Sequence, residues 1–140
     1  MTTPVYALLA FATWTYLLLL ATVGWYRWSR ILTGRAPISS FKASDPEGSD
    51  WYLRAMRAHA NCVENLPVFG AVVFAIYVAG VSTAAINALA VIVPLARIGQ
   101  TLTHVAFEET NTAVSFRFAF FLAQVICVLA MVTLLLVKLN

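Results

Sequence analysis

Charged side chains are scarce in this sequence: Asp, Glu, Lys and Arg together make up 11% of its 140 residues. An ordinary soluble domain is about 25% charged and about 45–50% apolar. Here 61% of the residues are hydrophobic, and the mean hydropathy is +0.83. A soluble fold of this length cannot bury so much apolar surface, whereas a lipid bilayer can accommodate it. The composition therefore excludes an ordinary soluble domain and indicates a single-domain integral membrane protein.

Several motifs of soluble enzymes are also missing. The sequence has no glycine-rich phosphate loop, no CxxC pair and no histidine spacing typical of a metal site, so no metal ligands are predicted. The formal net charge of +3 is modest and forms no basic stripe, so nothing indicates a nucleic-acid partner. Cys62 and Cys127 lie far apart in apolar surroundings, and we expect them to be small core residues.

Four apolar segments are each long enough to cross a bilayer, which takes about 20 residues of helix. The first carries no charge from Pro4 to Tyr26. It lacks the basic start of a signal peptide and is too long for a signal-peptide core, so we interpret it as a membrane helix. Pro67 and Pro94 are expected to kink the second and third helices. The predicted organisation is one all-α bundle, residues 1–140, with helices at about 4–27, 51–79, 84–107 and 113–138.

The longest polar stretch, residues 28–50, contains Gly, Pro and Ser and is predicted to be a loop. Lys and Arg gather in and beside this loop, but the N-terminus and the turn after the second helix have neither. By the positive-inside rule the loop is cytoplasmic, and both termini lie on the other side. The turn that carries Glu108 and Glu109 is then cytoplasmic too.

Polar residues form stripes along the membrane helices at about 100° per residue. One arc of the second helix carries Arg54, Arg57, Asn61, Glu64 and Asn65. The third helix carries Arg97, Gln100, Thr101 and His104. Glu64 and Arg97 both lie too deep to reach water by snorkelling, and an unpaired charge at that depth is expensive. We therefore expect a Glu64–Arg97 ion pair between neighbouring helices.

Arg117 lies near the cytoplasmic end of the fourth helix, and Gln124 lies two turns deeper on the same face. Because all of these groups occupy the cytoplasmic half, we predict one cavity that opens to that side. Its cationic lining would suit a ligand with carboxylates. That lining is Arg54, Arg57, Arg97 and Arg117. Two alternatives stay open: the deep ion pair is purely structural, and the outer arginines bind lipid headgroups or snorkel to water.

The second helix contains the run RAHANCVENLP, residues 57–67. This run resembles the second-helix signature of the MAPEG family, the membrane-associated proteins in eicosanoid and glutathione metabolism. The Ala96-Arg97 pair of the third helix, and four hydrophobic helices within about 140 residues, are similar to the same family. The resemblance therefore covers nearly the whole chain. It is to the bacterial-type members of the family, which implies a position in an inner or plasma membrane.

The resemblance implies a homotrimer with glutathione as cofactor, held on the cytoplasmic side between neighbouring subunits. The positions that it implies for glutathione binding are Arg54, Arg57, Asn61, Glu64, Arg97 and His104. The last of these stands where many members have a tyrosine. Catalytic members use an arginine near the start of the fourth helix, often followed by serine, to stabilise the glutathione thiolate, and Arg117 is the candidate here.

Two positions depart from the family pattern. The arginine–serine pair is absent, because Ser115 follows Val114 and the nearby arginine is Arg117, about one turn further along. Ala60 stands where some eicosanoid-forming members have another arginine. These departures bear on catalysis more than on glutathione binding.

The favoured function is a membrane-embedded glutathione-dependent transferase or peroxidase that acts on lipophilic electrophiles or lipid hydroperoxides. Its expected partners are glutathione, a lipophilic substrate and membrane lipids. One alternative is a non-catalytic membrane protein of the same fold that binds a ligand or a partner, which the displaced arginine favours. Another is a lipid-binding or transport-type bundle unrelated to thiols, which the cationic interface favours.

Overall fold

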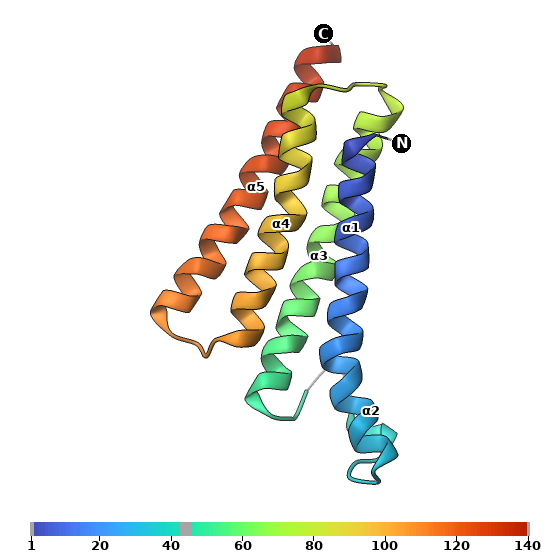
Figure 1. The fold of residues 1–140 in the computed structure, drawn as a ribbon, viewed down its shortest axis with the longest axis vertical. Coiled ribbons are helices and arrows are strands. Elements are labelled where there is room, and N and C mark those ends of the chain that lie inside the picture. The colour runs from blue at the N-terminus through green and yellow to red at the C-terminus, as the bar shows by residue number, and fades with distance from the viewer. Residues whose placement is uncertain (1, 43–45, 140) are drawn as a thin grey trace.

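The computed structural model describes residues 2–42 and 46–139, which form a bundle of long helices (Figure 1). The elements are α1 (Thr3–Leu18), the π-helical turn η1 (Leu19–Gly24), α2 (Trp25–Leu32), the 3-10 turn η2 (Ile38–Ser40), α3 (Asp50–Val78), α4 (Ala84–Ala106) and α5 (Asn111–Leu139). The first three helical elements run on as one span, Thr3–Leu32. This span, α3, α4 and α5 are each long and apolar enough to cross a membrane. The predicted all-α architecture with four membrane helices is confirmed.

Two connections lie together at one end of the bundle, which we call the loop end (Figure 1). Their described residues are 33–42 and 46–49, between α2 and α3, and 107–110, between α4 and α5. Both termini and the α3–α4 turn lie at the opposite end. That turn uses Gly80 with φ +66°, a left-handed conformation that other residues rarely adopt. The first span continues to Leu32, beyond the end expected near residue 27, and includes the π-helical turn at Leu19–Gly24.

The core of the bundle combines aromatic and small side chains. The Phe11 and Phe69 rings lie 6.0 Å apart between α1 and α3, and both side chains are buried. Cys62 and Cys127 are free and buried, which confirms their assignment as core residues. Large apolar side chains elsewhere point outward, as they do when the surroundings are lipid rather than water.

α4 and α5 make the most extensive helix pair of the bundle. Gly99 allows this close approach, since a Cβ added there would lie only 2.8 Å from the Phe120 ring. Gln124 Nε2 donates a hydrogen bond to Gln100 Oε1 at 3.0 Å and another to the Phe120 carbonyl at 2.9 Å. A small residue and a buried amide pair therefore join the two helices that carry Arg97 and Arg117.

We expect the Gln100–Gln124 hydrogen bond to stabilise the bundle measurably. Side-chain hydrogen bonds between membrane helices contribute about 0.6 kcal/mol on average and up to about 1.7 kcal/mol. Gln100→Leu and Gln124→Leu should each lower the free energy of unfolding in detergent. The double variant should lose less than the sum, by about 0.6–1.7 kcal/mol. A double-mutant cycle with no coupling would mean that the amides do not hold α4 against α5.

Candidate functional site

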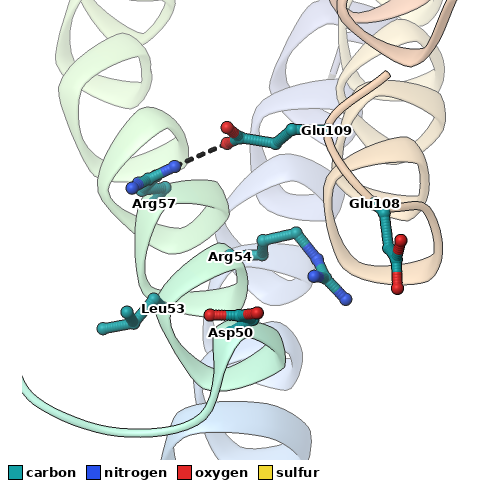
Figure 2. Close-up of a pocket in the computed structure, with 6 residues that line it drawn as sticks. All are labelled: Asp50, Leu53, Arg54, Arg57, Glu108 and Glu109. Atoms are coloured by element: carbon teal, nitrogen blue, oxygen red, sulfur yellow. Dashed lines mark hydrogen bonds and ion pairs between the residues drawn. The ribbon is translucent and has the colours of Figure 1, made fainter.

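A polar cavity of about 380 Å³ lies at the loop end, between the start of α3 and the α4–α5 turn (Figure 2). Its volume falls within the usual range of ligand pockets, about 300–1,000 Å³. The residues that line it are Asp50, Leu53, Arg54, Arg57, Glu108 and Glu109. Two guanidinium groups and three carboxylates therefore face one small space.

The start of α3 is held in place by an aromatic and cationic cluster. Ser49 caps the helix, because its Oγ accepts a hydrogen bond from the Tyr52 main-chain N–H at 3.4 Å. The Tyr26 and Tyr52 rings stack with their centroids 4.1 Å apart. Arg27 Nε donates to the Tyr52 hydroxyl at 2.8 Å, and the Arg30 guanidinium lies 4.2 Å from the Tyr26 ring centroid. These contacts fix α3 against α2 and so fix where its first arginines lie.

The opposite wall of the cavity is a tight turn that ends in another cap. Thr110 Oγ1 accepts a hydrogen bond from the Ala113 main-chain N–H at 3.2 Å and begins α5. The Thr110 main-chain N–H donates to the Glu108 carbonyl at 2.9 Å. The turn brings Glu108 and Glu109 to the cavity, opposite α3 (Figure 2).

Glu109 links two arginines from different helices. Its Oε1 accepts a hydrogen bond from Arg57 Nη1 at 2.5 Å, and the same oxygen lies 3.7 Å from Arg117 Nη1. Arg117 Nη2 also donates to the Phe107 carbonyl at 3.4 Å. The side chains of Arg57 and Glu109 are 60% and 53% exposed, but that of Arg117 is only 9% exposed. The network thus leads from an open cavity to a buried cation at the start of α5.

Polar residues on three helices recur seven positions apart. Seven residues of helix rise about 10 Å and return to nearly the same face. One layer, at the loop end, consists of Arg57, His104 and Arg117. The other, about 10 Å deeper, consists of Glu64, Arg97 and Gln124.

The expected Glu64–Arg97 ion pair is wrong. Glu64 is exposed, whereas Arg97 is 1% exposed, and none of its guanidinium nitrogens has a hydrogen-bond partner among the described residues. The Arg97 guanidinium lies instead 5.6 Å from the centroid of the Phe11 ring. The reason is the rotation of α3 about its axis. Cys62 faces the core with 0% exposure, so Glu64, about 200° further round, lies on the outer face of α3 and acts on Arg97 only as a charge at longer range.

The expected cationic lining is also wrong in part. Arg54 and Arg57 line the cavity, but Arg97 and Arg117 do not, and carboxylates share the wall. The predicted site does not include Glu108 and Glu109, which the structure places in the cavity wall. The predicted topology places both glutamates on the same membrane side as the basic start of the second membrane helix. That shared side is the sequence signal that indicates them.

The other predicted binding residues differ in how near they lie to the cavity. Arg54 lines it, and the Arg54 Nε is buried without a hydrogen-bond partner among the described residues. His104 is half-buried, its Nδ1 is likewise unpartnered there, and the charges of Arg117 and Glu109 act on its ring. Asn61 is half-buried and lies outside the lining.

A second pocket, of about 160 Å³, lies deeper between the four membrane helices and is mainly apolar. It is lined by Phe11, Asn65, Val68, Phe69, Val93, Gln124, Val125, Val128 and Leu129. A cavity of about 150 Å³ is large enough to bind benzene. Val68 and Leu129 are themselves exposed on the outer surface, so this pocket has lipid-facing walls.

Sequence comparison identifies the family. Residues 4–137 match the sequence profile of the MAPEG family. The chain belongs to the MAPEG family. It is therefore an integral membrane protein of the kind associated with eicosanoid and glutathione metabolism, as the run at residues 57–67 indicates. No curated protein matches the chain.

In this MAPEG chain the side chains of Arg117 and Ser115, near the start of α5, lie in different surroundings. Arg117 is buried, while Ser115 is exposed and its Oγ donates to the Asn111 carbonyl at 2.8 Å. The Arg117 side chain therefore faces the interior of the bundle, and the Ser115 side chain faces its outer surface. Arg117, rather than Ser115, is the residue connected to the cavity, through Glu109.

The ion pairs of Glu109 should contribute little to stability, because the Arg57 pair is exposed and the buried Arg117 is 3.7 Å away, near the outer limit of an ion pair. Exposed pairs contribute about 0–1 kcal/mol. Glu109→Gln should therefore lower the free energy of unfolding by less than about 1 kcal/mol. Glu108→Gln is the matched control, because the Glu108 side chain makes no hydrogen bond or ion pair with the other described residues. A loss of several kcal/mol in equilibrium unfolding of Glu109→Gln would show that the network holds the fold itself.

Proposed function

We propose that this MAPEG protein binds glutathione at the polar cavity and acts as a glutathione-dependent transferase or peroxidase on lipophilic electrophiles or lipid hydroperoxides. The observation that supports this most directly is that the guanidinium groups of Arg54 and Arg57 line the cavity. Glu109 links Arg57 to Arg117. Glutathione carries two carboxylates and one ammonium group. Arginine binds carboxylates through charge-assisted, often bidentate hydrogen bonds. Asp50 provides the negative charge that an ammonium group requires.

Arg117 is the proposed catalytic residue. A thiol with a pKa of about 8.5 is mostly protonated at neutral pH, and a nearby guanidinium favours the reactive thiolate. Arg117 is suited to this role because it is shielded from water and its Nε has no hydrogen-bond partner among the described residues. A cation in a shielded site stabilises a developing negative charge more strongly than one in bulk water.

The two reactions share the thiolate as nucleophile. In transfer, the sulfur forms a bond to the electrophilic carbon, and a leaving group departs with the electron pair or a proton is taken up by the adduct. In peroxide reduction, the sulfur attacks the terminal oxygen, the O–O bond breaks and an alcohol is released. A second glutathione then converts the sulfenic acid to the disulfide and water. The cavity would supply proximity by holding the tripeptide.

The lipophilic substrate is proposed to reach the thiolate from within the bilayer. The helices that carry Arg57 and Arg117 also line part of the apolar pocket, and its lining includes the exposed side chains of Val68 and Leu129. Its volume of about 160 Å³ suits an aromatic ring or a short length of acyl chain. An apolar molecule dissolved in lipid could enter there without crossing water.

A homotrimer would account for the outward-facing polar residues of α3. Glu64 is exposed in the single chain, and a charge that faces lipid is expensive. A neighbouring subunit packed on this face would cover Glu64 and Asn61 and bring them to a ligand held between subunits. Arg97 and His104, on α4, are the other proposed binding residues. The basic loop supports a cytoplasmic position for the loop end and thus for the site.

A non-catalytic ligand-binding or partner-binding role is the second candidate. The observation that favours it is the engagement of Arg117 with the Phe107 carbonyl and Glu109, which directs two of its nitrogens away from a thiol. Turnover separates the two candidates, whereas binding alone does not.

Glutathione should raise the thermal stability of the detergent-purified protein in a saturable way. A ligand at 100 times its dissociation constant adds about 2.7 kcal/mol to the native state. Arg57→Ala and Arg54→Ala should abolish most of this shift, because each removes a cavity guanidinium. The matched control is Arg35→Ala, an exposed cation in the loop outside the cavity lining. An equal shift in all four proteins would place glutathione elsewhere, and no shift in any would reject the proposal.

Arg117→Ala should reduce turnover much more than binding. Removal of one electrostatic stabiliser typically lowers kcat by about 10²–10³-fold. Steady-state assays with a chlorinated aromatic electrophile and with an organic hydroperoxide would measure kcat, and the thermal shift would measure binding. Turnover that persists unchanged in Arg117→Ala would exclude this residue. Binding without turnover in the wild-type protein would favour the non-catalytic role.

A further inference from the structure

The contact between Glu109 and two arginines has the chemistry of a ligand contact. One oxygen, Oε1, serves both guanidiniums, at 2.5 Å from Arg57 Nη1 and 3.7 Å from Arg117 Nη1. A carboxylate is thus already present between a residue proposed to bind glutathione and the residue proposed to stabilise its thiolate. A carboxylate ligand that enters the cavity therefore finds Arg57 already occupied.

We propose that Glu109 is an internal counter-ligand: in the empty protein its carboxylate occupies the arginine contacts that a carboxylate of the incoming ligand takes over. The inference rests on the proposed glutathione site and adds a specificity-determining residue to it. Glu109 sets a threshold, because only a ligand that binds the guanidinium better than Glu109 does can displace it.

The strength of the contact allows this exchange. The side chains of Arg57 and Glu109 are more than half exposed, and exposed pairs are weak because water competes for both partners. The shared use of one oxygen is also a poorer arrangement than the bidentate arginine–carboxylate pair that a free ligand can form. Glu109 belongs to the short turn of residues 107–110, so its side chain can leave the arginine without moving a helix.

The exchange also changes Arg117. While Glu109 is in place, its carboxylate partly neutralises the charge of this buried cation. When Glu109 leaves, the full positive charge becomes available to a thiolate. Ligand binding and activation of the proposed catalytic arginine are thereby coupled through one carboxylate.

The first arm of the test compares glutathione affinity in three proteins by isothermal titration in detergent: wild type, Glu109→Gln and Glu108→Gln. Both variants remove one negative charge from the same turn and the same cavity, but only Glu109 contacts the arginines. Glu109→Gln should bind glutathione about two- to fivefold more tightly, the range that matches the strength of an exposed ion pair. Glu108→Gln should bind as wild type does.

Two results in this arm would overturn the proposal. Equal tightening in both variants would mean that the cavity responds only to its total charge. Weaker binding in Glu109→Gln would mean that Glu109 positions the arginines for the ligand rather than competing with it. If Glu109→Gln does not fold, Glu109→Asp replaces it, since a side chain shorter by one methylene loosens the same contact.

The second arm needs no glutathione and so separates the inference from the proposed function. Phenylglyoxal modifies free guanidiniums, and peptide mass spectrometry gives the labelling rate of Arg57. The rate should rise in Glu109→Gln but not in Glu108→Gln. A rise confined to Glu109→Gln, without any glutathione binding, would reject the proposed function and keep Glu109 as the group that blocks the arginine. Equal labelling in all three would overturn the inference.

Discussion

A polar side chain inside a bilayer has no water to bind, and the arrangement of this protein follows from that constraint. The membrane helices keep most of their ionisable groups near the loop end, where water is within reach. The polar groups deeper in the bundle contact other side chains instead of water. Gln100 and Gln124 bind each other, and Arg97 lies against the face of the Phe11 ring. The site therefore forms where water can solvate charged side chains, at one end of an otherwise apolar bundle.

Two helix starts turn this charged end into a cavity. Ser49 begins α3 and Thr110 begins α5, and each cap fixes the turn before it. The first cap, with the stacked tyrosines, positions Arg57, and the second positions Glu109. The cavity thus depends on two local sequence features that are far apart in the chain. They meet because consecutive helices run antiparallel, so that α3 and α5 both start at the loop end (Figure 1).

The sequence predicts the architecture well and the site incompletely, for physical reasons. Long apolar runs determine the number of membrane helices, and the residue 57–67 run indicates the family. Periodicity assigns Glu64 to a polar arc but does not say how α3 is rotated against its neighbours, so the expected pair with Arg97 is wrong. The role of Glu109 depends on a turn geometry and a distant arginine, neither of which a single sequence contains. The π-helical turn at Leu19–Gly24 has no sequence signal that we recognise.

In the proposed exchange, a glutathione carboxylate replaces Glu109 at the arginines of the loop end. The most direct measurement is an experimental structure of the protein in lipid nanodiscs with glutathione bound. We expect a glutathione carboxylate on Arg57, the thiol beside Arg117 and the Glu109 side chain turned away from both. Glutathione bound elsewhere, or bound in the cavity with the Arg57–Glu109 contact intact, would contradict it.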